Sequence, residues 1–338
     1  MGVQIIGLGH RMPLKRQTNE ELCESLDVTP EWIEEKTGIT GRQIAEENEE
    51  VRDYAVSAAL LALQNSHSSV DEIDLIIVCT FSNDYVFPPL AVRVQQQLGI
   101  RTAHSFDVQV NCAGFVTGLT IAAERLNSDR TLRNALVIGA EFSSRFINVA
   151  DKETAIFHSD GAGAAVLTRT DRDGYLVSAF GSDVENVESV RLRGGGAGFR
   201  DFNKIENEPN SWFMEMNGLA TWRQAITHLP RVIRDVCAKA SVDVSQVDKF
   251  IFHQANLRLI EYLVRKLKRD MSSTFTNVER VGNSGAASIP IVLSEAQTAG
   301  FLQDGDLVCV AGIGAGFTFG ASLWRWGSIN PGDQHETI

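Results

Sequence analysis

The chain has 338 residues, of which 43% are hydrophobic, and its formal net charge is −12. This length and composition are typical of a globular protein with one large core or two fused domains, and the negative charge opposes general binding to nucleic acid or anionic lipid. No apolar run approaches the roughly 20 residues of a membrane helix, and no basic segment precedes an apolar stretch at the N-terminus, so we expect a cytoplasmic protein without membrane segments.

In the first half, apolar patterns predict an amphipathic helix followed by strands around a buried helix. Apolar residues at three- and four-residue spacing predict the amphipathic helix over residues 51–64. Near-continuous apolar runs predict strands buried on both faces at residues 71–79, 134–138 and 163–167. A strand over residues 105–110 leads into residues 112–126, whose small and apolar side chains are typical of a buried helix. Residues 160–163 predict a turn that leads into the last strand.

The second half repeats this order after a polar segment. Residues 183–210 are glycine-rich and predict an exposed loop or flap, and residues 222–240 predict an amphipathic helix. A strand, a small-residue helix and a strand follow at residues 249–253, 284–299 and 307–311. The repeated unit predicts an α/β protein of two duplicated lobes, residues 1–172 and 173–338, with helices packed between sheets.

The five cysteines are odd in number and contain no CxxC pair, which indicates neither a disulfide framework nor a zinc site. They are Cys23, Cys79, Cys112, Cys237 and Cys309. Cys112 stands between a predicted strand and the N-terminus of the buried helix, where free N–H groups and the helix dipole favour the reactive thiolate. A small buried hydrophobe is the alternative interpretation of Cys112, and we expect the other four to be structural.

Two polar residues of the second half are candidate partners of this cysteine. His253 ends a predicted strand, and strand C-termini of α/β sheets are where ligand-binding residues gather. Asn283 precedes the second small-residue helix as Cys112 precedes the first. Each residue also has an ordinary structural interpretation, His253 as a hydrogen-bonded residue and Asn283 as a helix N-cap or turn residue.

The glycine-rich stretch at residues 312–317, GIGAGF, imitates the start of a dinucleotide-binding fingerprint. Residues 318–324 predict a strand instead of the helix that such a site needs, so a dinucleotide site is not expected. A tight glycine turn can instead offer a backbone N–H to an oxyanion, as acyl transfer requires.

Residues 256–270 predict a helix with one basic face. At roughly 100° per residue, Arg258, Arg265 and Arg269 lie within about 40° of one another, and Lys266 and Lys268 flank them. Such a run is usually a solvated face. Because this helix begins close to His253 on an acidic chain, it is also a candidate docking surface for an anionic partner.

Six ordered motifs, spread over nearly the whole chain, resemble the β-ketoacyl-acyl carrier protein synthase III family. They are EWI with TGI at 31–33 and 37–39, NCAGF at 111–115, DGAGA at 160–164, HQAN at 253–256, GN with AAS at 282–283 and 286–288, and GFT at 316–318. The resemblance implies a thiolase-like fold, a five-layered αβαβα sandwich of two duplicated lobes that forms homodimers. It also implies a catalytic triad of Cys112, His253 and Asn283.

In this family an acyl-CoA acylates the cysteine, and malonyl-acyl carrier protein then loses carbon dioxide. The resemblance therefore implies that His253 and Asn283 stabilise an enolate, which attacks the acyl-cysteine and gives a β-ketoacyl product. A neutral imidazole N–H and an amide can both donate to an oxyanion, and the backbone N–H groups of Cys112 and Ala315 would hold the thioester oxygen. We expect no metal or redox cofactor.

Other site residues also follow from the resemblance alone. CoA is expected at Trp32, Lys36, Lys152, Asn256 and Arg258, and the carrier protein at Arg258, Arg265, Lys266 and Arg269. Phe87 and Ile313 are expected to border the acyl pocket, Phe87 across the dimer. The family commonly has arginine where this chain has Lys36 and Lys152, and lysine lacks the bidentate phosphate geometry of arginine. These departures, with Asn111, Ile313, Ala315 and residues 183–210, permit an unusual acyl donor.

The leading hypothesis is therefore the condensation that initiates fatty acid synthesis. One alternative is a related enzyme of secondary metabolism that condenses or transfers an unusual acyl group. An alternative of another class is a non-catalytic partner that docks carrier protein, since folds are reused without their reactions.

Overall fold

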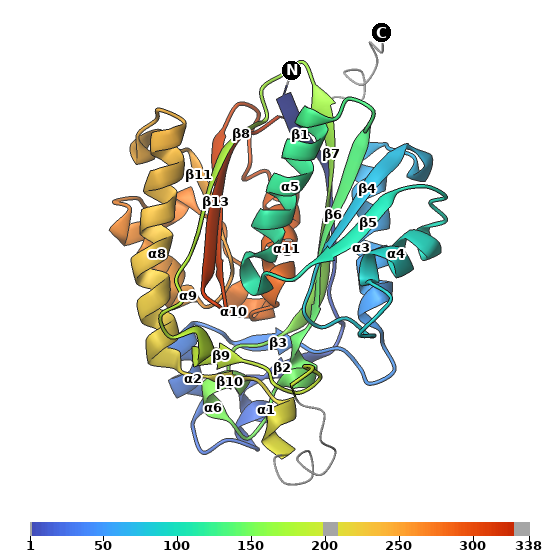
Figure 1. Cartoon of the computed structure of the whole chain (residues 1–338). Helices are drawn as coiled ribbons and strands as arrows, with labels where there is room; N and C mark the ends of the chain where they lie inside the picture. The colour runs from blue at the N-terminus through green and yellow to red at the C-terminus, as the bar shows by residue number, and fades with distance from the viewer. Residues whose placement is uncertain (1, 199–208, 328–338) are drawn as a thin grey trace.

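The computed structural model describes residues 2–198 and 209–327, and two sheets dominate it (Figure 1). The first sheet has the order β1 (Gly2–Arg11), β7 (Asp160–Thr170), β6 (Asn134–Phe142), β4 (Ile73–Cys79) and β5 (His104–Val108). β7 runs antiparallel to β1 and β6, whereas β6, β4 and β5 are parallel. All residues of β6 are buried, as its apolar run predicts. Residues 160–163, predicted as a turn, are instead the first residues of β7, which corrects that expectation.

The second sheet repeats the order of the first. Its strands are β11 (Lys249–Phe252), β12 (Leu307–Gly314), β13 (Thr318–Arg325) and β8 (Tyr175–Ser182). β11 and β12 are parallel and the other pairs antiparallel, as are the corresponding β4, β6, β7 and β1. Thr274 forms a parallel bridge with Phe250 where β5 would pair with β4. The duplicated architecture predicted from the sequence is therefore confirmed.

Helices make three layers around the two sheets. α5 (Gly114–Ser128) and α11 (Ser288–Thr298) lie between the sheets (Figure 1). α3 (Val51–Ser66) and α4 (Leu90–Leu98) cover the outer face of the first sheet, and α8 (Gly218–Lys239) and α9 (Leu257–Lys266) cover that of the second. Three apolar clusters fill the spaces between these layers. The molecule is thus the predicted five-layered αβαβα sandwich.

The central helix α5 packs closely against the first sheet because its residues are small. A Cβ at Gly118 would lie 2.7 Å from the Cys79 Sγ and 3.0 Å from a Val137 methyl carbon, so a larger residue would push the helix away. The helix begins at Gly114, two residues later than predicted. Cys112 lies in the 3₁₀ turn Asn111–Ala113 that precedes it.

Small elements gather at one end of the sandwich, the lower end in Figure 1. They are β2 (Arg16–Thr18), α1 (Asn19–Cys23), α2 (Pro30–Thr37), β3 (Gly41–Gln43), α6 (Lys152–Ala155), β9 (Val190–Arg191), β10 (Glu215–Met216) and α10 (Val278–Val281). The predicted flap at 183–210 belongs here, and residues 199–208 of it lie outside the described residues. Its described part is more ordered than an exposed loop, since β9 pairs with β10 and Arg191 and Arg193 both bind Glu215.

Within the described parts of the chain, no helix combines the length and apolar character needed to cross a bilayer. Over the same residues, no group of three or more histidine, cysteine, aspartate or glutamate side chains could hold a metal ion.

Candidate active site

A cavity of 1310 Å³ brings together the three residues that the sequence nominates for chemistry. Cys112, His253 and Asn283 all line it, although they come from segments far apart in the chain. Cys112 follows β5 of the first sheet, whereas His253 follows β11 and Asn283 precedes α11. The cavity therefore takes its reactive groups from both halves of the duplicated fold.

The turn that carries Cys112 packs directly on the end of β12. A Cβ at Gly314 would lie 3.0 Å from the backbone nitrogens of Cys112 and Ala113, so this position has no room for a side chain. Asn111, immediately before the cysteine, has a left-handed backbone with φ of 47°. Asparagine tolerates this conformation better than most residues. The nucleophile turn and the glycine turn at 312–317 are thus in close contact.

The electrostatic environment of Cys112 differs from the sequence expectation. Burial, followed by the nearby Glu141 carboxyl, raises the pKa of the Cys112 thiol to about 12. The N-terminus of α5 was expected to lower this pKa, but the helix begins two residues later, and desolvation opposes the charged form. Desolvation therefore favours the neutral thiol in the free protein.

His253 is fixed by both its backbone and its ring. Its N–H donates to the Ala311 carbonyl at 2.9 Å, which continues the β11–β12 pairing. Its Nδ1 lies 2.7 Å from Ser288 Oγ on α11. Burial, and then the neighbouring His158, lower the pKa of His253 to about 3. The imidazole is therefore neutral, and Nε2 is the ring nitrogen left for a substrate.

Three hydrogen bonds orient Asn283. Its N–H donates to the Phe157 carbonyl at 2.8 Å, and its carbonyl accepts from Ser159 N–H at 2.9 Å. The side-chain Oδ1 accepts from the backbone N–H of Gly285 at 3.0 Å. Because Oδ1 is held in this way, the Nδ2 amide is turned away from Gly285 and is free to donate within the cavity that Asn283 lines.

Glu141, a buried acid on β6, lies close enough to Cys112 to raise its pKa. This residue is not predicted from the sequence. Its carboxyl oxygens accept from the backbone N–H of Phe81 and from the hydroxyls of Thr80 and Ser82. Burial nevertheless raises its pKa to about 8. The signal that could have revealed it is the single charged residue in the otherwise apolar strand 134–142. Such a residue is costly to bury and therefore has a structural or functional reason.

Four of the five residues expected at CoA also line the cavity: Trp32, Lys36, Lys152 and Asn256. Lys36 and Lys152 are exposed, and Asn256 caps α9 by accepting from Leu259 N–H at 2.9 Å.

The fifth residue, Arg258, has other partners. Its guanidinium donates to the Glu35 and Glu34 carbonyls at the end of α2, at 2.9 and 3.0 Å, and pairs with Glu261. It is not among the described residues that border the cavity. Arg258 links α9 to α2 in this structure.

The basic face of α9 is smaller than predicted. Arg265 and Lys266 are exposed, whereas Arg258 and Arg269 are half-buried. Arg269 lies beyond the helix end, where it donates to the Ser245 carbonyl at 2.8 Å. The apolar residues Ile260, Leu263, Val264 and Leu267 are buried, as the helical pattern predicts.

The two residues expected at the acyl pocket, and Ala315, also line the cavity. Ile313 is buried at the end of β12, whereas Phe87 is 81% exposed. Residues 312–314 end β12, and residues 315–317 lead into β13 (Thr318–Arg325), the strand that the sequence predicts at this position.

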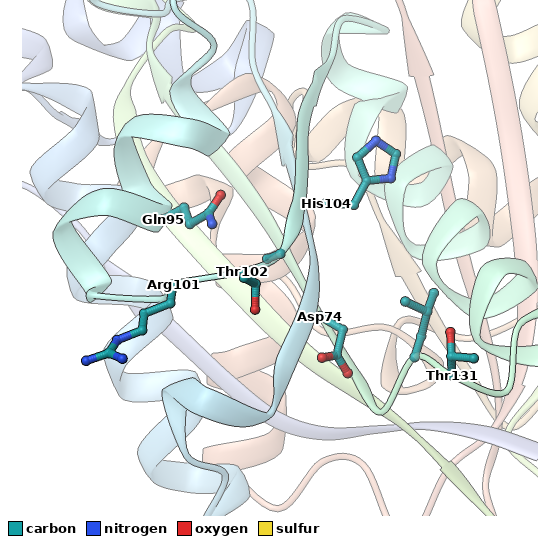
Figure 2. Close-up of a pocket in the computed structure, with 8 residues that line it drawn as sticks. Asp74, Gln95, Arg101, Thr102, His104 and Thr131 are labelled. Atoms are coloured by element: carbon teal, nitrogen blue, oxygen red, sulfur yellow. The ribbon is translucent and has the colours of Figure 1, made fainter.

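A second hollow, of 620 Å³, lies at the edge strand β5 (Figure 2). Its lining residues are Asp74, Gln95, Arg101, Thr102, Ala103, His104, Thr131 and Leu132. It contains no cysteine and none of the candidate residues above. The reactive groups therefore belong to the larger cavity.

Comparisons with known proteins identify the family. The family model of 3-oxoacyl-[acyl-carrier-protein (ACP)] synthase III matches residues 106–184, and that of its C-terminal part matches residues 237–326. The chain is 38% identical to the β-ketoacyl-[acyl-carrier-protein] synthase III of Syntrophomonas wolfei, over 97% of this chain and 98% of that protein.

Two solved structures have the same fold. The 3-oxoacyl-[acyl-carrier-protein] synthase III of Aquifex aeolicus superposes with a TM-score of 0.89 at 35% identity, over 96% of this chain and all of that one. The priming β-ketosynthase of the R1128 polyketide pathway superposes with a TM-score of 0.90 at 30% identity, over 97% of both chains. With its thiolase-like fold and its similarity over nearly the full length, the chain belongs to the β-ketoacyl-[acyl-carrier-protein] synthase III family.

Proposed function

We propose that this protein joins the acyl group of an acyl-CoA to malonyl-acyl carrier protein through an acyl intermediate on Cys112. The products are a β-ketoacyl-acyl carrier protein, carbon dioxide and CoA. The observation that carries the proposal is the meeting of one thiol and two oriented neutral donors, His253 and Asn283, in one cavity.

The first half-reaction transfers the acyl group to sulfur. Cys112 loses its proton, and the sulfur attacks the thioester carbonyl to form a tetrahedral oxyanion. The backbone N–H groups of Cys112 and Ala315 would donate to this oxyanion; the packing of the adjacent Gly314 on the cysteine turn supports their proximity. The carbonyl then re-forms, the C–S bond to CoA breaks, and the leaving CoA sulfur receives the proton.

The second half-reaction forms the carbon–carbon bond. The bond between the malonyl carboxylate and the α-carbon breaks, and its electron pair becomes an enolate whose oxygen accepts hydrogen bonds from His253 and Asn283. The α-carbon attacks the acyl-cysteine, the C–S bond breaks, and the leaving Cys112 thiolate takes a proton from water to restore the resting thiol. The low pKa of His253, about 3, supports a role as a neutral donor, since the ring keeps one N–H over the whole physiological range. This chemistry requires no metal or redox cofactor.

The substrate contacts are part of the proposal. We assign Trp32, Lys36, Lys152 and Asn256 to CoA, because an aromatic ring and two exposed cations suit a nucleotide with phosphates. Arg265 and Lys266 are the exposed cations of α9 and would bind the acidic carrier protein, with Arg269 beside them. Arg258 would contribute to either partner only after releasing the carbonyls of α2.

We further propose that two copies of the chain pair through the edge of the first sheet. Tyr85, Val86 and Phe87 are 52%, 89% and 81% exposed, and β5 is an edge strand. An exposed apolar patch beside an open edge indicates an interface. In the dimer Phe87 would close the acyl pocket of the partner. Light scattering of the purified protein should give twice the chain mass, and Val86→Glu should give the mass of one chain.

The proposal also assigns residues 1–172 to a lobe that carries the nucleophile and residues 173–338 to a lobe that carries the two donors. The join between them falls between β7 and β8. Because both substrates are water-soluble thioesters, we propose a cytoplasmic location.

Intact mass spectrometry tests the reaction. Incubation with acetyl-CoA and longer acyl-CoAs should add one acyl group to the wild type and none to Cys112→Ala. Carbon dioxide should then be released from malonyl-acyl carrier protein, and far less of it by Asn283→Ala. An acyl adduct that persists in Cys112→Ala would contradict the nucleophile assignment.

A second candidate function is the priming of a secondary metabolite. The similarity to the R1128 priming β-ketosynthase favours it, as does lysine at positions 36 and 152. The set of acyl-CoAs that label Cys112 separates the two, because the fatty acid hypothesis expects a short acyl donor, whereas the alternative expects an unusual one. If the protein binds carrier protein but no acyl-CoA labels Cys112, the non-catalytic alternative is supported.

A further inference from the structure

His158 is a second histidine of the cavity, and neither half-reaction above uses it. It lies between α6 and β7, is only 8% exposed, and borders the cavity that holds Cys112, His253 and Asn283. It is close enough to His253 to lower that residue's pKa. A buried polar ring in this position requires a partner or a function.

The backbone sets His158 beside Asn283. The two residues form a parallel β-bridge, in which Asn283 N–H donates to the Phe157 carbonyl at 2.8 Å and Ser159 N–H donates to the Asn283 carbonyl at 2.9 Å. Residues paired in this way project their side chains from the same face. Both side chains line the cavity, so the imidazole and the Asn283 amide are neighbours on its wall.

The surroundings of the ring indicate which nitrogen carries the proton. Nδ1 of His158 is fully buried and has no hydrogen-bond partner among the described residues. An orphaned buried N–H is rarer than an unsatisfied acceptor, which favours a bare lone pair at Nδ1 and the proton at Nε2. Burial also lowers the pKa of His158 to about 4, so the ring is neutral and presents one N–H.

We propose that His158 is a third donor to the enolate oxygen formed from the malonyl unit, alongside His253 and Asn283. The inference rests on the proposed condensation and deepens it. The hydrogen stays on Nε2 throughout, while the electron pair of the broken carbon–carbon bond moves to the enolate. The contact therefore strengthens as negative charge develops and selectively stabilises the decarboxylation step.

Two variants of similar volume test this role. His158→Leu removes the donor, and His158→Asn retains an amide that can donate. Carbon dioxide release from malonyl-acyl carrier protein at saturation should fall about 10- to 100-fold in His158→Leu, since one donor of three is lost. It should fall less in His158→Asn. Acylation of Cys112 by acyl-CoA should stay within about twofold of the wild type in both, because that step uses other donors.

Acylation of Cys112 and carbon dioxide release, measured side by side, distinguish a donor role of His158 from a merely structural one. An equal loss of acylation and decarboxylation, or equal rates in the leucine and asparagine variants, would overturn the donor assignment. If the leucine variant does not fold, His158→Phe, which keeps a planar ring without a donor, replaces it in the comparison with asparagine. A wild type that neither acylates nor releases carbon dioxide overturns the proposed function and this inference together.

Discussion

The side-chain amide of Asn111 donates from Nδ2 to the Ala315 carbonyl oxygen at 3.0 Å, across 204 residues of sequence. Asn111 immediately precedes the Cys112 nucleophile. Ala315 lies in the glycine turn, and its backbone N–H is proposed to hold the thioester oxygen. The bond therefore ties the two sides of the acylation site together. Asn111 also has the left-handed backbone that only a few residues adopt at low cost.

Asn111→Gly should separate the effect of the hydrogen bond to Ala315 from that of the left-handed backbone, because glycine adopts this backbone conformation but cannot form the bond. We expect acylation of Cys112 by acyl-CoA to slow about fivefold to tenfold, as the loss of roughly 1 kcal/mol implies. Alkylation by iodoacetamide needs no oxyanion donors and should change by less than about twofold.

Asn111→Ala adds a backbone cost of about 1–2 kcal/mol, so its melting temperature should fall below that of the glycine variant. Rates are followed by intact mass. Equal effects of Asn111→Gly on acylation and alkylation would mean that the bond does not position the oxyanion donors.

Ser288→Ala should weaken decarboxylation, because it removes the only side chain seen bonded to the His253 ring among the described residues. Ser288 Oγ also accepts from Gln254 N–H at 3.3 Å, which leaves its own hydrogen to Nδ1 and favours the tautomer with Nε2–H. With the ring free to rotate, we expect carbon dioxide release to fall about 10- to 100-fold.

Ser294→Ala is the matched control for this experiment. Ser294 lies on the same helix α11 and bonds His10 Nδ1 at 2.9 Å, away from the residues of the cavity. It should leave carbon dioxide release unchanged while causing a similar small loss of stability. A loss of activity in both variants would indicate a general effect of loosening α11.

The sequence predicts the fold well because its strongest signals are local. The apolar run at residues 134–138 predicts a buried strand, and the small and apolar residues in the first part of α5 predict a buried helix. The candidate triad comes from the family resemblance, because the positions of Cys112, His253 and Asn283 at strand ends and helix starts leave each with a structural alternative.

The features of the site that could not be predicted from the sequence depend on contacts between distant segments of the chain. Ser288 is one of many serines until the fold brings it to His253, and His158 gains interest only from its bridge to Asn283. The pKa of Cys112 was predicted in the wrong direction, because the helix end is visible in the sequence whereas burial of the thiol beside Glu141 is not. Arg258 likewise could not be assigned to the end of α2 without the packing of α9.

The raised pKa of Cys112 predicts an unusual pH profile for alkylation of the free enzyme. Only the thiolate reacts, so a thiol with a pKa of about 12 gains reactivity about tenfold per pH unit and shows no plateau between pH 6 and 10. The rate of iodoacetamide incorporation, with Cys112→Ala subtracted for the other thiols, measures this. A plateau above about pH 8.5 would instead indicate an ordinary thiol.

Glu141 predicts a pH dependence of stability. Its pKa is about 8 in the folded protein and about 4.3 when unfolded, so between these values the folded state holds a proton that the unfolded state has lost. The stabilising effect of this proton is complete below about pH 4.3 and is lost as pH rises through about 8. In that window the free energy of unfolding should fall by up to about 1.4 kcal/mol per pH unit.

Glu141→Gln removes this titration and keeps most of the shape of the side chain. Relative to the wild type, its melting temperature should therefore rise from pH 5 and level off above about pH 8, where the folded protein has also lost the proton. Glu24→Gln, at an exposed glutamate, should track the wild type throughout. Differential scanning calorimetry from pH 5 to pH 9 provides the comparison.

If the difference in melting temperature between Glu141→Gln and the wild type is constant with pH, then Glu141 is ionised in the folded protein, held by the donors Thr80, Phe81 and Ser82. In that case its charge would oppose the Cys112 thiolate at every pH at which the enzyme works.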